Sequence, residues 1–460
     1  MPHSTSRLAV TFGYGATLVS AVAIFLWIRT VGERLGGASV LRQSQAALEG
    51  PAINTVSHLL LALAVIIITA RAMGVLFSWF DQPAVIGEVV GGIMLGPSVL
   101  GRLAPGVLAG LLPPAVAPFL GIHAQLGIML YMFLVGLELD LGVLRKSGHA
   151  TIAISHASII VPFLLGSGLA LVIYPVLSTS DVPFTVFALF IGVSMSITAF
   201  PVLARILTDR GIHKTRMGTL ALACAAVDDV TAWCLLALVV SIAHARGLQA
   251  LWTAGLTVAF ITLMFVVMRP LVRRWLPTIQ GHEKISRTGL STVFAAMLAS
   301  AMATEYIGIH GIFGAFMFGA IVPHDSRVAA DLHDRLSDVV AILFLPAFFA
   351  FTGMRTEIGL ISGVGDWLLC GAITLVACVG KFGGTLFAGR LTGLKWRDSA
   401  ALGVLMNTRG LVELIVLNIG LDLHVISPRL FTMLVVMALV TTFMTTPILQ
   451  RIVRSDPWTH

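Results

Sequence analysis

The chain has 460 residues, of which 57% are hydrophobic and 11% are charged, whereas about 25% of residues are charged in a typical soluble domain. This composition excludes a soluble globular domain and indicates a protein that crosses a membrane many times. The formal net charge of +7 does not indicate nucleic-acid binding, because the basic residues form no stripe and are not interleaved with aromatic residues.

Apolar stretches long enough to cross a bilayer follow one another along the chain. A hydrocarbon core of about 30 Å requires about 20 apolar residues for each helical crossing, and this length predicts fourteen membrane-spanning helices. Their approximate ranges are 8–28, 57–77, 84–101, 120–139, 150–174, 184–206, 216–242, 250–272, 288–304, 307–322, 338–354, 366–390, 398–420 and 429–450. The sequence therefore predicts an all-α polytopic membrane protein.

The first predicted span resembles a signal peptide only superficially. Its apolar run is long and no clear small-residue cleavage site precedes Trp27, so a signal anchor is favoured. We expect residues 1–56 to form this helix and a loop, residues 57–450 one membrane domain, and residues 451–460 a short cytoplasmic tail.

The distribution of basic residues predicts the orientation of the chain. The loops on the side of the N-terminus hold 19 of the 29 Lys and Arg residues, the opposite loops hold 7, and the spans hold 3. By the positive-inside rule, both termini are predicted to be cytoplasmic. We expect the protein to lie in a bacterial inner membrane.

Two predicted spans are interrupted near their middles. The interruptions contain Ser196, Thr198 and Pro201 in span 184–206, and Asn407, Thr408, Arg409 and Gly410 in span 398–420. Proline lacks a backbone N–H and glycine weakens a helix, so each interruption frees backbone groups. A membrane tolerates such groups only inside protein or along a cavity. Because the two spans are seven crossings apart, any repeat that relates them is inverted, and broken helices at matching places in two inverted repeats predict a transporter binding site.

Asp228 and Asp229 lie in the middle of span 216–242. An ionisable group at the bilayer centre costs about 2.5–3.5 kcal/mol on an insertion scale, so two adjacent carboxylates indicate an ion site. Neighbouring helix residues point about 100° apart, so we expect one carboxylate to face the broken helices and the other to face a cation. Lys381, in the middle of span 366–390, is the candidate for that cation.

The chemistry expected of these three groups is proton coupling. Burial disfavours the charged form of an acid or a base, whereas pairing favours it, so protons and a monovalent cation are expected to compete for the carboxylate oxygens. A purely structural buried ion pair is the alternative, but one carboxylate suffices for that role and the two interruptions are then unexplained.

Other polar residues in the spans are secondary candidates. Arg409 precedes Glu413 by four residues, and two roles are open: an ion pair where the helix resumes, or neutralisation of the half-helix ends. Weaker candidates for the site are Glu88, Ser196, Glu305 and His310. A further set has side chains that bind metals or respond to pH, but its spacing matches no metal signature, so a solvated cytoplasmic loop is favoured; the set is His324, Asp325, His333 and Asp334.

Seven stretches resemble the sodium/hydrogen exchanger domain of the monovalent cation/proton antiporter superfamily, in its second branch. They are QPAVIGEVVGGIMLGPSVLG (82–101), FLVGLELDL (133–141), ITAFPVLARIL (197–207), AAVDDVTAW (225–233), IGIHGIFGAFMFGAIVP (307–323), GKFGGTLFAGR (380–390) and NTRGLVELIVLNIG (407–420). They cover most of residues 57–450 in the family's order, and the last is most similar to plant cation/H+ exchangers and their bacterial relatives.

The resemblance implies a thirteen-helix exchanger, with span 8–28 as an addition, in which a mobile core domain moves against a dimerisation domain by an elevator motion. It implies that Asp229 binds the monovalent cation or a proton in turn. It also implies that Asp228 is the partner of Lys381 and that Thr198 lies at the first break beside the ion. The residues left with helix-break or structural roles are Pro201, Asn407, Thr408, Arg409 and Glu413.

The two aspartates also bear on stoichiometry. Family members with two aspartates and a lysine are similar to electrogenic exchangers that move two protons against one Na+, whereas Asn before the Asp is typical of electroneutral ones. The flanking sequence is similar to the plant-type group, in which Asn often holds the first position and K+ is often the substrate, yet residue 228 is Asp. We therefore expect an electrogenic antiporter of Na+ or K+ and H+.

Three alternatives stand beside this hypothesis. A K+ efflux channel is disfavoured because no carbonyl filter such as TVGYG occurs, and an intramembrane enzyme is disfavoured because no HExxH or GxSxG motif occurs. An antiporter for an organic cation or an ion–ligand complex stays open. We expect a homodimer that contacts membrane lipid and has neither a cofactor nor a nucleic-acid partner.

Overall fold

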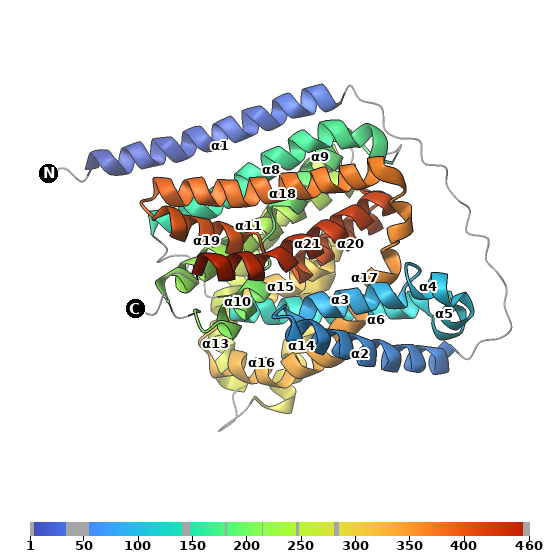
Figure 1. The fold of residues 1–460 in the computed structure, drawn as a ribbon. Helices are drawn as coiled ribbons and strands as arrows, with labels where there is room; N and C mark the ends of the chain where they lie inside the picture. The colour runs from blue at the N-terminus through green and yellow to red at the C-terminus, as the bar shows by residue number, and fades with distance from the viewer. Residues whose placement is uncertain are drawn as a thin grey trace.

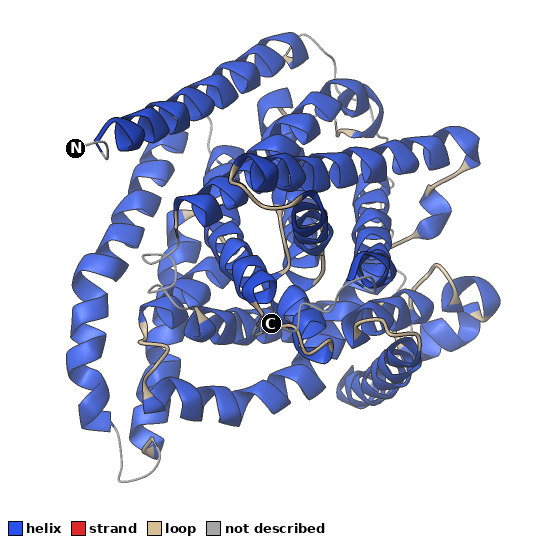
Figure 2. Cartoon of the chain, turned by 60° about the vertical axis from the view of Figure 1, so that its left-hand side comes forward, coloured by secondary structure: helices blue, strands red, loops and turns tan. Residues whose placement is uncertain are grey.

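The computed structural model describes residues 4–33, 55–139, 148–179, 182–213, 215–244, 248–279 and 285–453. Within these ranges every regular element is a helix and no strand is formed (Figure 2). The expected all-α fold class is confirmed. The loop of 1–56 beyond residue 33 and most of the tail 451–460 lie outside the described residues.

The helices pack into two bundles. In Figure 1, α8, α9 and α18 of one bundle lie in the upper part, and α2, α14 and α16 of the other lie in the lower part. The core bundle comprises α8 (His149–Leu177), α9 (Phe184–Ser196), α10 (Phe200–Asp209), α11 (Arg216–His244), α18 (Gly363–Leu391), α19 (Trp396–Met406), α20 (Leu411–Asp422) and α21 (Pro428–Val453). The scaffold bundle comprises α2 (Thr55–Trp79), α3 (Ala84–Leu95), α4 (Leu100–Leu103), α5 (Pro105–Leu111), α6 (Ala117–Glu138), α12 (Leu248–Leu263), η1 (Met264–Met268), α13 (Arg269–Ile279), α14 (Arg287–Ile307), α15 (Gly311–Ile321), α16 (Arg327–Val339), η2 (Val340–Phe344), α17 (Leu345–Arg355) and η3 (Ile358–Leu360). The first helix, α1 (Ser4–Gly32), lies against α8 and α9 of the core bundle.

Eleven helices of the described residues are long and apolar enough to cross a membrane, or up to twelve if α19 and α20, bent by 45°, are one span. One of the fourteen predicted spans falls short of that length. Span 307–322 becomes α15, which has 11 residues and is about 16 Å long, because it begins only after a turn at Gly308 with φ +93°. Span 8–28 lies within α1, a helix of 29 residues.

The helix packing repeats itself in the order that an inverted repeat requires. Four contacts have a counterpart seven spans away: α2–α3 and α14–α15, α3–α17 and α15–α6, α8–α9 and α18–α19, and α8–α11 and α18–α21. The two self-paired contacts, α6–α17 and α8–α18, are also present. The two predicted inverted repeats are therefore visible in the packing.

Glycines permit close approach at two equivalent helix contacts, α3–α17 and α15–α6. In α17, a Cβ on Gly353 would lie 2.1 Å from the carbonyl carbon of Gly92 in α3. In α15, a Cβ on Gly319 would lie 2.3 Å from the carbonyl oxygen of Phe133 and 3.0 Å from the Cα of Gly136, both in α6. Small residues permit such backbone contact between membrane helices, and both contacts fix the interior of the scaffold bundle.

Candidate functional site

The two broken spans cross inside the core bundle. The backbone N–H of Ala199, between α9 and α10, donates to the carbonyl of Thr408, between α19 and α20, at 3.0 Å. Pro201 occupies the first turn of α10, where its missing N–H costs no helical hydrogen bond. On the other chain segment, a Cβ on Gly410 would lie 2.7 Å from the side chain of Val202. The residues that were expected to interrupt the spans therefore create the crossing.

Asp228 of α11 is completely buried and fully held by its neighbours. One carboxylate oxygen accepts a hydrogen bond from Ser155 at 2.5 Å. The other accepts from Ser158 at 2.6 Å, from Thr198 at 3.0 Å and from the Nζ of Lys381 at 2.9 Å. These four donors compensate the cost of burying this carboxylate.

Asp229 is the next residue and has a different environment. Its side chain is 3% exposed, and neither of its carboxylate oxygens accepts a hydrogen bond from the described residues. The carboxylate lies near the backbone of Phe200, the first residue of α10, where the positive end of a helix dipole favours an anion. An unpaired buried carboxylate is costly, so Asp229 is the group of this pair that requires a proton or a cation.

The carbonyl ends of α9 meet two buried cations. Arg409 donates to the carbonyls of Ser194 and Met195, each at 2.6 Å, and to Glu413 at 2.8 Å. Lys381 donates to the carbonyl of Ser196 at 2.5 Å. Both contacts considered for Arg409 are thus present together, and the negative end of α9 is neutralised as the helix dipole requires.

Several buried oxygens at the crossing have no hydrogen-bond partner among the described residues. Besides the two of Asp229, they are Ser194 Oγ, Asn407 Oδ1 and Thr408 Oγ1. Buried polar atoms are paired in most proteins, so each exception calls for an explanation. Carboxylate, amide and hydroxyl oxygens are also hard ligands suited to alkali-metal cations.

A narrow crevice approaches Asp229 along one face of α11. Trp233, Leu236 and Val240 follow Asp229 at helical spacing and line the crevice together with Phe313 of α15. The ring of Trp233 stacks on Phe316 of α15 at 5.9 Å between centroids, one turn from Asp229. This aromatic contact joins α11 to α15 at the boundary between the two bundles.

The chain matches the family model described as sodium/hydrogen exchanger, transmembrane, over residues 58–454. It belongs to the sodium/hydrogen exchanger family. The chain is 43% identical to the Na(+)/H(+) antiporter NhaS4 of Synechocystis over 401 residues, which cover 87% of this chain and 98% of the relative. It is 41% identical to cation/H(+) antiporter 20 of Arabidopsis thaliana and 37% identical to K(+)/H(+) antiporter 1 of Saccharomyces cerevisiae. These matches cover 87% and 84% of this chain, and it spans 49% and 45% of those two proteins.

The fold of this exchanger-family chain is similar to that of the sodium proton antiporter MjNhaP1 from Methanocaldococcus jannaschii. The TM-score is 0.64 at 11% sequence identity, with 87% of this chain and 97% of that chain covered. The similarity extends the family assignment to the architecture of the membrane domain.

The remaining candidates of this family member lie away from the crossing. Glu88 lies in α3 of the scaffold bundle, beside Gly74 of α2. Glu305 accepts a hydrogen bond from the backbone N–H of Gly311 at 2.7 Å and so caps α15. The prediction of a loop around His333 is wrong, because residues 327–339 form the helix α16. His333 lies on its polar face, with Nδ1 at 3.3 Å from Glu138 Oε1.

Two features of the site were missed by sequence reasoning. Ser155 and Ser158 lie three residues apart on one face of α8 and supply two of the four groups that donate to Asp228. Thr198, expected beside the ion at Asp229, donates instead to Asp228. The spacing of the two serines was visible, but the sequence does not show which helix face α8 presents to α11.

Proposed function

We propose that the protein is a secondary active antiporter that exchanges a monovalent cation, Na+ or K+, for protons. The observation that carries the proposal is the difference between the two adjacent carboxylates. Asp228 is held by Lys381 and three hydroxyls, whereas Asp229 is buried with no side-chain donor among the described residues. Asp229 then takes either a proton or the cation, and exchange follows from this competition.

The proposed movement is an elevator motion of the core bundle against the scaffold bundle. Support comes from the location of the complete Asp228–Asp229–Lys381 set in the core bundle, and from the crevice on the boundary between the bundles. Broken helices that carry a site near the middle of inverted repeats are typical of alternating-access transporters. We further propose a homodimer in a bacterial inner membrane, in contact with lipid and with both termini cytoplasmic.

We propose an electrogenic exchange of two protons for one cation. A cation bound at Asp229 displaces one proton from that carboxylate, and the buried ammonium of Lys381 releases the second proton when its ion pair with Asp228 opens. One net charge moved is worth about 2.3 kcal/mol per 100 mV of membrane potential, so the membrane potential contributes directly to the driving force.

A pH-gradient assay in proteoliposomes tests this function. An acid-inside gradient is imposed, and Na+, K+, Li+ and Rb+ are added in separate experiments, since the named relatives include both a Na(+)/H(+) and a K(+)/H(+) antiporter. We expect at least one cation to dissipate the gradient with saturable kinetics. If every cation at saturating concentration leaves the gradient intact while the protein is folded, the proposal is wrong.

A further inference from the structure

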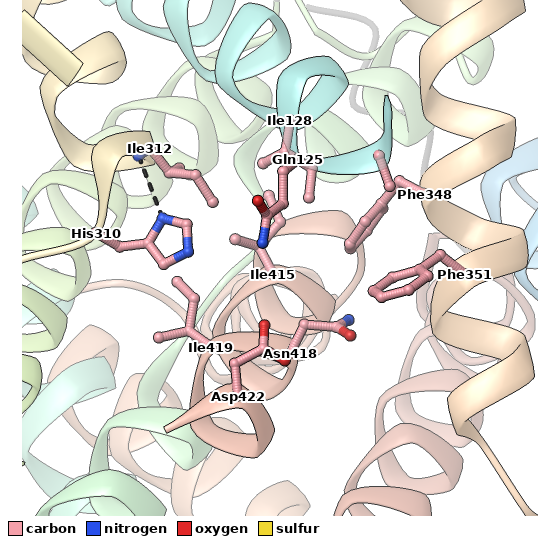
Figure 3. Close-up of a pocket in the computed structure, with 11 residues that line it drawn as sticks. Gln125, Ile128, His310, Ile312, Phe348, Phe351, Ile415, Asn418, Ile419 and Asp422 are labelled. Atoms are coloured by element: carbon pink, nitrogen blue, oxygen red, sulfur yellow. Dashed lines mark hydrogen bonds between the residues drawn. The ribbon is translucent and has the colours of Figure 1, made fainter. Parts of the chain in front are cut away.

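A second part of the crevice opens at the ends of α17 and α20, on the boundary between the bundles (Figure 3). Asn418 and Asp422 of α20 line one side of it, and Gln125 of α6 and His310 before α15 line the facing side. Ile312 and Ile419 belong to this part and also to the deeper part that reaches Trp233. Four polar side chains thus lie at the outer part of a mostly apolar crevice, whose other part is lined by Trp233, one helical turn after Asp229.

Arg355, the last residue of α17, joins the two bundles at this mouth. Its guanidinium donates to Asn418 Oδ1 at 3.0 Å and forms an ion pair with Asp422. It also lies over the ring of Phe351, 5.1 Å from the centroid. Asn418 in turn donates to Thr352 of α17 at 2.9 Å. These bonds connect the scaffold bundle to the core bundle through charged and amide groups.

At the opposite end of the molecule, the matching residue makes no equivalent bond to the core bundle among the described residues. In the inverted repeat, Glu138 at the end of α6 corresponds to Arg355 at the end of α17, since each follows a packed glycine, Gly136 or Gly353, by two residues. Glu138 contacts His333 of α16, which belongs to its own bundle. Between the bundles at that end, Asp81 reaches Arg210 at 3.8 Å and Gln450 at 3.4 Å, and its side chain is 69% exposed.

We propose that Arg355 is a positioning residue that keeps the mouth at Asn418 and Asp422 closed, and that its release opens the crevice towards Asp229. The proposal rests on the proposed alternating access, in which the core bundle moves against the scaffold bundle. That movement carries Asn418 and Asp422 away from α17, so the bonds of Arg355 break in every cycle. Loss of these bonds raises the population of the state that is open at this mouth.

The test measures the opening of the crevice without requiring transport. The four native cysteines are replaced by alanine, and Ile312, which is 2% exposed at the junction of the two crevice parts, is changed to cysteine. A membrane-impermeant thiol reagent is applied from the side of the mouth. We expect Arg355→Gln to raise the labelling rate by about three- to tenfold, the range for loss of a partly exposed ion pair and a hydrogen bond to a charged group.

Two further variants separate this role of Arg355 from a general destabilisation of the helix packing. The reference protein carries Ile312→Cys in the cysteine-free background and keeps Arg355. Arg102→Gln changes an exposed arginine of α4 at the same end of the molecule and should leave the labelling rate equal to that of the reference protein. Asp422→Asn should raise labelling as Arg355→Gln does, and the double variant should add little, because both remove one interaction. Unchanged labelling in Arg355→Gln, or full additivity in the double variant, overturns the proposal.

Transport measured from each side gives a second readout. Arg355→Gln should lower the KM for the cation on the side of the mouth and raise it on the opposite side, whereas a purely structural role shifts both in the same direction or only the maximum rate. A shift of both KM values in the same direction contradicts the proposal. If the reference protein exchanges no cation for protons, the proposed function fails, while the labelling experiment still decides the role of Arg355.

Discussion

Lys381 and Asp228 form a closed pair, with 2.9 Å between Nζ and Oδ2 and no solvent exposure on either side chain. Asp229, the next residue of α11, has no such partner among the described residues. Two carboxylates that are neighbours in sequence thus have different surroundings. The paired one joins α11 to α8, α18 and the crossing, and we propose that the unpaired one binds the transported ion.

We expect Asp229→Asn to abolish exchange and leave the protein folded. The amide is neutral at every pH and does not release a proton to a cation, while the neighbouring hydrogen-bond network is untouched. Cation-driven dissipation of a pH gradient in proteoliposomes is the measurement, with elution volume and thermal unfolding in detergent as the test of folding. Exchange at the normal rate in this variant would contradict the assignment of Asp229.

We expect Lys381→Ala to destabilise the protein more than the double variant Lys381→Met with Asp228→Asn. Removing one partner leaves Asp228 buried without its cation, which costs about 3–5 kcal/mol, whereas replacing both partners is often nearly neutral. Thermal unfolding midpoints in detergent decide the order. If the unfolding midpoint decreases equally in the single and double variants, the Asp228–Lys381 pair itself contributes little to stability.

The same pair is expected to set the voltage dependence of exchange. In Asp228→Asn we expect transport to continue with a weaker response to membrane potential or a shifted pH profile, since Asp229 is still present. The initial rate is measured at clamped potentials, where one net charge corresponds to about 2.3 kcal/mol per 100 mV. If neither this variant nor Lys381→Ala changes the voltage response, the charge balance is set elsewhere.

Hydropathy and chain-breaking residues predicted most of the fold. Spans of about 20 apolar residues placed the long helices, and Pro201 and Gly410 located the crossing, because both signals are local. Predicted span 307–322 came out too short because helix length also depends on where caps and turns interrupt an apolar stretch, as at Gly308 before α15.

The sequence predicted that Asp228, Asp229 and Lys381 would lie together. It did not predict that the two carboxylates would have different contacts. Asp228 and Asp229 are chemically identical, and only the tertiary contacts of Ser155, Ser158 and Thr198 make one a fixed anion. Arg355 gave no signal either, since its partner Asp422 is far away in sequence and the pair exists only because two bundles meet there.

We expect the two serines of α8 to affect the stability of the protein and the pH profile of exchange through their hydrogen bonds to Asp228. They should not be required for exchange itself. Ser155→Ala and Ser158→Ala each remove one donor from the carboxylate, and a hydrogen bond to a charged group is worth about 1.5–3 kcal/mol. The variants should unfold at lower temperature and shift the pH profile of exchange while keeping its maximum rate. Ser291→Ala, at an exposed position of α14, is the control. A pH profile equal to that of the control in both variants would show that these serines do not act on the site.

Glycine contacts in the scaffold bundle give the last prediction, which concerns stability alone. In Gly319→Ala the new methyl group would lie 2.3 Å from the carbonyl oxygen of Phe133 and 3.0 Å from the Cα of Gly136. Both are backbone atoms, so α6 and α15 have to separate, and overpacking of this kind costs about 1–3 kcal/mol. Gly383→Ala in α18 places the same methyl group where no heavy atom lies within 4 Å, and glycine to alanine inside a helix gains about 0.5–1 kcal/mol. The midpoint temperature of thermal unfolding in detergent should therefore fall in Gly319→Ala and stay the same or rise in Gly383→Ala. A similar decrease in both variants would mean that the effect of close packing cannot be separated from the effect of adding a methyl group to any helix of this protein. The backbone contact between α6 and α15 would then lose its role in fixing the scaffold.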